Sequence, residues 1–132
     1  MEQDQMPRKR ILLVDDEGIV RESIRLLLSM DNHTVVEANN GVEALYLFTR
    51  AEFDLVVTDF QIPFMKGSEL AARIKQLLPR QPILMITGHA EKPGPDNPVD
   101  AVLDKPFNLN QLRAAMARVL SEEVEEAESL TA

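Results

Sequence analysis

The chain contains 132 residues, a length that suits one compact domain with a sizeable core. Its 14 basic and 22 acidic residues give a net charge of −8, which argues against direct nucleic-acid binding because that needs a basic face. The lack of cysteine excludes a disulfide framework, and no apolar run approaches the ~18 residues of a membrane span.

The two ends of the chain differ in charge from the segment between them. The basic cluster Arg8–Arg10 leads into only four apolar residues, unlike a secretory signal, so we expect a flexible start over residues 1–8 and a cytoplasmic protein. Residues 121–132 hold five glutamates and no basic residue, which leaves a net charge of −3 on the rest of the chain. We therefore predict one domain over residues 9–121 and an acidic tail over residues 122–132, either an extension of the last helix or a linker.

Five short runs of apolar residues predict β-strands. Most are continuous in Val, Ile and Leu rather than alternating, which is typical of parallel strands covered on both faces. In chain order they are Ile11–Val14, Thr34–Glu37, Leu55–Thr58, Ile83–Thr87 and Ala101–Leu103.

Apolar residues spaced three or four apart predict a helix after four of these five runs. The stripes are Val20, Ile24, Leu27 and Leu28; Val42, Leu45 and Phe48; Leu70, Ile74, Leu77 and Leu78, ahead of a stop at Pro79; and Leu109, Leu112, Met116, Val119 and Leu120, with Asn108 as the N-cap. Alternating strands and helices predict right-handed βαβ units and a doubly wound, parallel α/β sheet.

The fourth crossover and the tail depart from this pattern. The segment Gly88–Val99 contains Pro93, Pro95 and Pro98, and each proline inside a helix costs about 3 kcal/mol. We therefore predict a loop there, with a fourth helix that is short or missing. In the tail, glutamates three or four apart cost a helix roughly 0.2–0.5 kcal/mol per pair, so we expect one or two extra helical turns and then fraying.

Polar and charged residues follow four of the predicted strands. The carboxyl ends of parallel strands meet at one edge of an open sheet, where ligands bind. That edge would hold Asp15, Asp16, Glu17, Asp59, Thr87 and Lys105.

Carboxylates crowded there repel by about 4 kcal/mol per pair at about 4 Å in an effective dielectric constant of about 20. A hard divalent ion relieves this repulsion, and Mg²⁺ typically takes one or two carboxylates, waters and a phosphate. Lys105 and the Thr87 hydroxyl then suit phosphate oxygens.

Each of these residues also has a purely structural explanation. Asp16 could cap the first helix, and Asp59 could be a turn residue before Gln61. Thr87 could be an ordinary strand residue, and Lys105 a surface lysine. These explanations account for single residues but leave the repulsion within the acidic cluster uncompensated.

The spacing of five motifs carries a resemblance to a known family. They are Asp15-Asp16-Glu17, Thr58-Asp59, Pro63-x-Met65-x-Gly67, Thr87-Gly88-His89 and Leu103-Asp104-Lys105-Pro106-Phe107. In this order they resemble the receiver domain of bacterial two-component response regulators, the CheY-like superfamily, over about residues 9–121. The resemblance implies a (βα)5 flavodoxin-like three-layer sandwich with the parallel strand order 2-1-3-4-5.

The resemblance implies a phosphoacceptor and a metal site. Asp59 matches the aspartate that receives a phosphoryl group, and it also belongs to the metal site. Asp16 matches the residue that binds Mg²⁺ directly, Asp15 the one that acts mainly through water, and Gln61 supplies a backbone carbonyl. Mn²⁺ can take the place of Mg²⁺.

The remaining implied roles concern charge, partners and output. Lys105 would balance the charge of the phosphoryl group, and the Thr87 hydroxyl would move to bond one of its oxygens. The donor would be a sensor histidine kinase or a phosphotransfer protein, and the modified domain would act on an output protein or effector domain. Such a domain is not an enzyme in the usual sense, although it assists its own phosphorylation and dephosphorylation. It would need no direct contact with nucleic acid or membrane, and homodimerisation stays open.

Some positions depart from the family or vary within it. Receivers usually carry Tyr or Phe where this chain has Val102, so the usual coupling of threonine and aromatic ring is altered. Val102 and the remodelled Gly88–Val99 segment both fall on the face that receivers commonly use to dimerise or to bind an output partner. We therefore expect this face to differ from that of other receivers. The side chains of Gln61 and His89 match places that tune phosphoryl lifetime, with a solvated loop histidine as the alternative for His89. Phe64 stands where the family often has glycine.

Three other functions are alternatives for this sequence. A receiver-like protein-interaction module that does not use phosphorylation is favoured by Val102 and the altered segment. A Mg²⁺-dependent phosphatase with an aspartyl nucleophile usually wants an acid where this chain has Gln61. Nucleotide or flavin binding lacks the glycine-rich phosphate loop.

Overall fold

The computed structural model describes residues 7–88, 94 and 97–131. Its sheet consists of five parallel strands in the order β2-β1-β3-β4-β5, which confirms the predicted topology. The strands are β1 (Arg10–Val14), β2 (Thr34–Ala38), β3 (Leu55–Asp59), β4 (Ile83–Thr87) and β5 (Ala101–Asp104). Each predicted strand lies within one residue of the observed bounds at either end.

Burial explains why the strand sequences are continuous rather than alternating. Every residue of β3 and β4 is buried, because these strands lie inside the sheet with helices on both faces. In β5, which forms one edge, the residues alternate between half-buried and exposed. The polar residues at the ends of β3 and β4, Asp59 and Thr87, are therefore buried as well.

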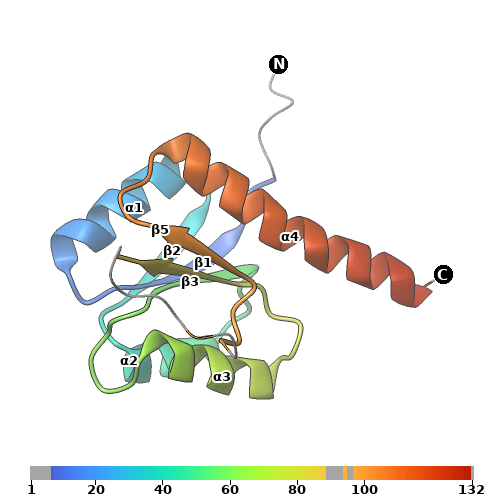
Figure 1. Cartoon of the computed structure of the whole chain (residues 1–132), viewed down its shortest axis with the longest axis horizontal. Coiled ribbons are helices and arrows are strands. Elements are labelled where there is room, and N and C mark those ends of the chain that lie inside the picture. Colours follow the sequence, from blue (N-terminus) through green and yellow to red (C-terminus); the bar gives the residue numbers. More distant parts are fainter. Residues whose placement is uncertain (1–6, 89–93, 95–96, 132) are drawn as a thin grey trace.

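The described part of the chain contains four α-helices, two on each face of the sheet (Figure 1). They are α1 (Gly18–Met30), α2 (Gly41–Phe48), α3 (Gly67–Leu77) and α4 (Leu109–Thr131). Residues of α2 and α3 pack with Leu12 and Val56 on one side, and residues of α1 and α4 pack with Leu13 and Val57 on the other. The three-layer sandwich is thus confirmed, and so is the predicted cap of α4, where Asn108 Oδ1 accepts a hydrogen bond from the Gln111 N–H at 2.8 Å.

Two apolar stripes are less buried than predicted, the first because its phase differs and the second only at its end. Val42 is 55% exposed, and the buried side of α2 is formed by Gly41, Ala44 and Phe48. The first turn of α2 lies so close to the Met65 side chain that a Cβ on Gly41 would collide with it, so the chain there must present glycine rather than valine to the core. Likewise Leu77 and Leu78 are half exposed at the end of α3, just before Pro79.

The connection from β4 to β5 contains no helix in its described residues, which are 88, 94 and 97–100. Asp100 fixes the return of the chain, since its Oδ2 accepts hydrogen bonds from the Ile83 N–H and from Lys75 Nζ, both at 2.8 Å. The count of four helices fits the expected shortening or loss of the fourth helix of a (βα)5 fold. The prediction for residues 89–93 and 95–96 lies outside the described residues.

The last helix is longer than expected. It continues from Leu120 to Thr131, about three turns rather than one or two. Residues 121–132 include five Glu, two Ala and one Leu, whose helix propensities are among the highest, and this preference opposes the repulsion between the glutamates. Within the described residues no helix is long and apolar enough to cross a membrane.

Candidate functional site

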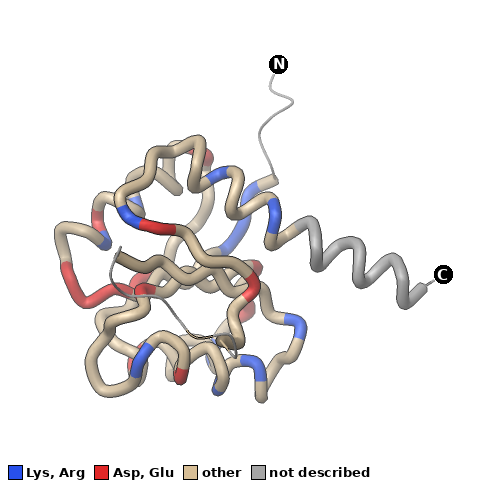
Figure 2. Tube along the Cα trace, in the orientation of Figure 1, with Lys and Arg blue, Asp and Glu red and all other residues tan. Residues whose placement is uncertain are grey.

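Three aspartates converge at the carboxyl edge of the sheet, as the sequence predicts. Asp15 follows β1, Asp16 comes next, and Asp59 ends β3, the strand that pairs with β1. One carboxylate oxygen from each lies within 4.8 Å of the other two. Asp15 and Asp59 are buried whereas Asp16 is exposed, so the cluster has one open side. Figure 2 shows consecutive acidic residues in the segment that joins β1 to α1.

Lys105 supplies a positive charge to this cluster. Its Nζ lies 3.0 Å from Asp59 Oδ1, and its side chain is 28% exposed. The backbone holds Lys105 in place, because its N–H donates a 2.7 Å hydrogen bond to the Thr87 carbonyl at the end of β4. The predicted meeting of Asp59 and Lys105 is therefore confirmed.

Burial and neighbouring charges shift two pKa values in the cluster. Burial raises the pKa of Asp15 from 3.8 to about 6, and the charge of Asp59 adds to the effect, although a hydrogen bond from the Glu17 N–H opposes it. Asp15 Oδ2 is buried and has no hydrogen-bond partner among the described residues. For Lys105, burial alone would lower the pKa, but the hydrogen bond and charge of Asp59 raise it above its ordinary value.

A cavity of about 260 Å³ opens at this cluster, lined by Asp16, Glu17, Asp59, Gln61 and Lys105. Gln61 thus lies where the sequence predicts it. Thr87 is fully buried, and its hydroxyl donates to Asp104 Oδ1 at 3.0 Å. The position of His89 lies outside the described residues.

The loop after β3 explains the Pro63-x-Met65-x-Gly67 motif. The Gly67 N–H donates to the Phe60 carbonyl at 2.9 Å, which folds the start of α3 back onto the end of β3. A Cβ on Gly67 would collide with the Asp59 carbonyl oxygen, so only glycine fits this approach. Phe64 has a φ of 74° in the left-handed region, and its side chain is 82% exposed. This exposure excludes Phe64 from the core and leaves its ring facing outward, free to meet a partner.

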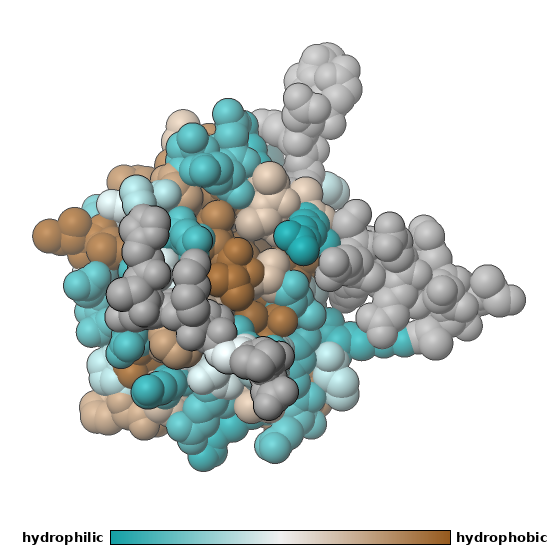
Figure 3. All heavy atoms as spheres, viewed as in Figure 1, coloured by the Kyte–Doolittle hydropathy of each residue, from teal (hydrophilic) through white to brown (hydrophobic). Residues whose placement is uncertain are grey.

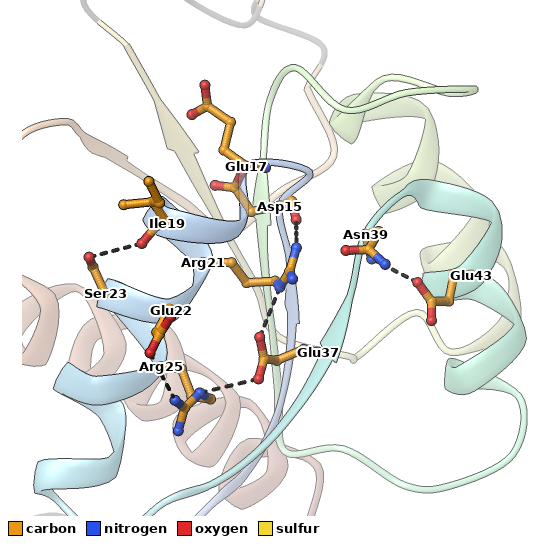
Figure 4. A network of polar contacts seen from close by, with 10 residues as sticks. All are labelled: Asp15, Glu17, Ile19, Arg21, Glu22, Ser23, Arg25, Glu37, Asn39 and Glu43. Carbon is orange, nitrogen blue, oxygen red and sulfur yellow. Dashed lines mark hydrogen bonds and ion pairs between the residues drawn. The ribbon is translucent and has the colours of Figure 1, made fainter.

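Arg21 is a site residue that the sequence does not reveal. Its Nη1 donates to the Asp15 carbonyl oxygen at 2.7 Å, and its Nε lies 2.8 Å from Glu37 Oε1. Arg25, one turn further along α1, contacts the other oxygen of Glu37 at 3.2 Å (Figure 4). The only signal in the sequence is the helical spacing of the two arginines, which does not indicate the carbonyl that Arg21 binds.

Two regions of the surface carry apolar side chains. Over the β5 edge of the sheet, apolar residues reach the face seen in Figure 3. Val102 lies on this strand and is 42% exposed. A second apolar surface, a cavity of about 280 Å³, lies between α1 and the segment after β5 and includes Ile19, Lys105 and Phe107 in its lining.

Sequence comparisons identify relatives over most of the chain. The model of the response regulator receiver domain family matches residues 11–117. Response regulator MprA of Mycobacterium leprae is 38% identical over 115 residues, which cover 84% of this chain and 50% of that protein. The autoinducer 1 sensor kinase/phosphatase LuxN of Vibrio campbellii is 32% identical over 114 residues, 84% of this chain and 13% of that protein. The chain thus spans about half of MprA and a smaller share of LuxN.

Structural comparisons agree with the sequence comparisons. Chemotaxis protein CheY4 of Vibrio cholerae superposes with a TM-score of 0.78 at 28% identity, covering 86% of this chain and 100% of that one. Response regulator protein TrrA of Thermotoga maritima, in complex with Mg²⁺-BeF, gives a TM-score of 0.80 at 31% identity, with 85% and 99% coverage. With the strand order and the convergence of Asp15, Asp59 and Lys105, these matches show that the chain belongs to the response regulator receiver domain family of two-component signalling.

Proposed function

We propose that this domain accepts a phosphoryl group on Asp59 in the presence of Mg²⁺, and that the modification changes a surface read by an output partner. One observation carries this proposal. The buried Asp59 carboxylate lies beside Lys105 Nζ at 3.0 Å and within 4.8 Å of oxygens of Asp15 and Asp16, in a cavity open to a donor.

The reaction would be a direct transfer between the donor and Asp59. A carboxylate oxygen of Asp59 forms a bond to phosphorus while the P–N bond of a phosphohistidine donor breaks. The electron pair of that bond stays on the imidazole nitrogen, which takes up a proton. Positioning and charge neutralisation supply most of the catalysis of such transfers, and Lys105 stands where it would neutralise charge on the phosphoryl oxygens.

The acidic cluster fits a divalent ion. Asp15 Oδ2 is a buried acceptor with no hydrogen-bond partner among the described residues, and burial together with the charge of Asp59 raises the pKa of Asp15. Asp15, Asp16 and Asp59, with the Gln61 carbonyl, would hold Mg²⁺ or Mn²⁺. When bound, the ion would neutralise negative charge on the cluster and on the phosphoryl group.

The partners follow from the same chemistry. A sensor histidine kinase or phosphotransfer protein would present its phosphohistidine to the cavity, and the apolar surface beside Lys105 offers it a docking area close to Asp59. The domain would act in the cytoplasm as a phosphoacceptor that assists its own phosphorylation and dephosphorylation, rather than as an enzyme with turnover. Phosphorylation would add a charge of about −2 to the domain, and this charge would favour the surface conformation that binds an output protein or effector domain.

Incubation with acetyl phosphate and Mg²⁺, followed by intact-protein mass spectrometry, tests the proposal. Wild type is expected to gain the mass of one phosphoryl group, and neither Asp59→Asn nor wild type in EDTA is expected to gain it. The exposed valine at position 102 favours a second candidate, a receiver-like interaction module that does not use phosphorylation. An unchanged mass for wild type with both acetyl phosphate and phosphoramidate would support that candidate instead.

A further inference from the structure

The hydroxyl of Thr87 is held by a carboxylate on the neighbouring strand. Thr87 ends β4 and Asp104 ends β5, and the parallel register places the two residues opposite each other. Thr87 Oγ1 donates to Asp104 Oδ1 at 3.0 Å. The next residue after Asp104 is Lys105, which reaches Asp59. The bond therefore lies directly beside the phosphoacceptor machinery without belonging to the lining of its cavity.

A hydroxyl group has a single proton to donate, which makes its partners exclusive. Thr87 can donate to Asp104 or to an oxygen of a phosphoryl group on Asp59, but not strongly to both. Bonds to a charged acceptor are stronger than bonds between neutral groups, so the Asp104 carboxylate is an effective competitor. The move of Thr87 toward a phosphoryl group requires that its bond to Asp104 break.

We propose that Asp104 is a positioning residue that retains the Thr87 hydroxyl in the unmodified domain and opposes its transfer to the phosphoryl group. The proposal rests on the proposed function of Asp59. Asp104 and Val102 are two residues apart, so they lie on the same face of β5, and both are exposed. A change of hydrogen-bond partner at Thr87 would therefore release the Asp104 carboxylate on the exposed face of β5. Val102 on the same face has no aromatic ring that could move in response.

The test must separate the hydrogen bond from the charge, because removing Asp104 also removes a negative charge near an incoming anion. Asp104→Asn loses the charge but keeps an oxygen that accepts from Thr87, whereas Asp104→Ala loses both. Making each change in a Thr87→Ala background as well completes a double-mutant cycle. The probe is beryllofluoride with Mg²⁺. Its binding is measured by NMR titration, because the chain contains no tryptophan whose fluorescence could report it.

We expect Asp104→Ala to bind beryllofluoride about tenfold more tightly than wild type, since the competing acceptor is gone. The affinity of Asp104→Asn for beryllofluoride should increase clearly less than that of Asp104→Ala. In the Thr87→Ala background the two changes should have equal effects, because no hydroxyl is left to retain. The proposal would be overturned if Asp104→Ala and Asp104→Asn raised beryllofluoride affinity equally with Thr87 present, or if neither raised it. A wild type that fails to bind beryllofluoride would instead refute the function of Asp59, and with it the role of Asp104.

Discussion

Arg21 donates a 2.7 Å hydrogen bond from Nη1 to the backbone carbonyl of Asp15, and so ties the first turn of α1 to the residue that follows β1 (Figure 4). The same side chain is held from β2 by Glu37 at 2.8 Å and is only 19% exposed. One guanidinium thus links the β1–α1 loop, α1 and β2, and it fixes the backbone that carries Asp15 and Asp16.

Arg21→Lys should weaken Mg²⁺ binding. A lysine ammonium cannot reach the Asp15 carbonyl and Glu37 with the fixed fork of a guanidinium, so the backbone of the acidic loop loses its support. We expect the Kd for Mg²⁺ to rise about three- to tenfold, measured by calorimetry or NMR titration. Arg25→Lys is the matched control, because Arg25 pairs with the same Glu37 but does not contact Asp15 among the described residues. Equal effects of the two substitutions would show that only the ion pairs with Glu37 matter.

Ionisation of Asp15 should lower the stability of the metal-free domain as pH rises through the acid range. The folded-state pKa of Asp15 is about 6 against 3.8 when unperturbed, so the folded state binds this proton more tightly than the unfolded chain. Folding is therefore disfavoured as Asp15 ionises, by roughly 2–3 kcal/mol between about pH 4 and pH 6, and the penalty stays constant above that range.

Urea unfolding in EDTA at several pH values measures this dependence. Asp15→Asn should be more stable than wild type at pH 7 and should lose this component of the pH dependence, while its Mg²⁺ affinity falls. Added Mg²⁺ should restore stability to wild type at pH 7 by mass action. A variant whose pH dependence matches that of wild type would place the raised pKa on another group.

Gly67→Ala should destabilise the domain and disturb the acceptor. The new Cβ would collide with the Asp59 carbonyl oxygen, which is backbone and cannot rotate away, so the start of α3 or the end of β3 must shift. We expect a loss of about 1–3 kcal/mol in the free energy of unfolding. Gly18→Ala is the control, since Gly18 also begins a helix but a Cβ there meets only the Arg21 guanidinium at 4.0 Å. That substitution should be neutral or slightly stabilising, and a similar loss at both positions would contradict the steric explanation.

Phe64→Gly should stabilise the domain. Phe64 has a φ of 74°, which costs an L-residue roughly 1–2 kcal/mol, and its side chain is 82% exposed, so little burial is lost on removal. We expect the free energy of unfolding to rise by about 0.5–1 kcal/mol, because glycine relieves the strain but loses more conformational entropy on folding. Phe64→Ala removes the ring but keeps the Cβ, and it should give no such gain in thermal or urea unfolding. If both variants are equally stabilising, the ring itself and not the backbone is unfavourable.

The elements of the fold follow from the sequence because their signals are local and repeated. Continuous apolar runs such as Leu55–Thr58 fix the strands, and a parallel sheet then brings Asp15, Asp59 and Lys105 to one edge whatever the details of packing. The phase of α2 does not follow, since hydropathy assigns Val42 to the core whereas close contact with Met65 requires Gly41 there.

Partners that depend on register and side-chain conformation lie beyond the sequence patterns. The bond from Thr87 to Asp104 needs the pairing of β4 with β5, and the bond from Arg21 to Asp15 needs a particular conformation of a long side chain. Apolar runs predict that strands exist, but a shift of one residue in their pairing would give Thr87 a different neighbour.

The strand order also bears on the sequence of events in folding. Asp15 and Asp59 meet when β3 pairs with β1, and this pairing is possible before β4 and β5 have joined the sheet. Lys105 follows β5 and can arrive only with the last strand. A partly assembled sheet would therefore contain the three crowded aspartates without their lysine, and a divalent ion would lower the barrier to forming it. We therefore expect the supply of Mg²⁺ to affect the rate at which the domain folds as well as its phosphorylation.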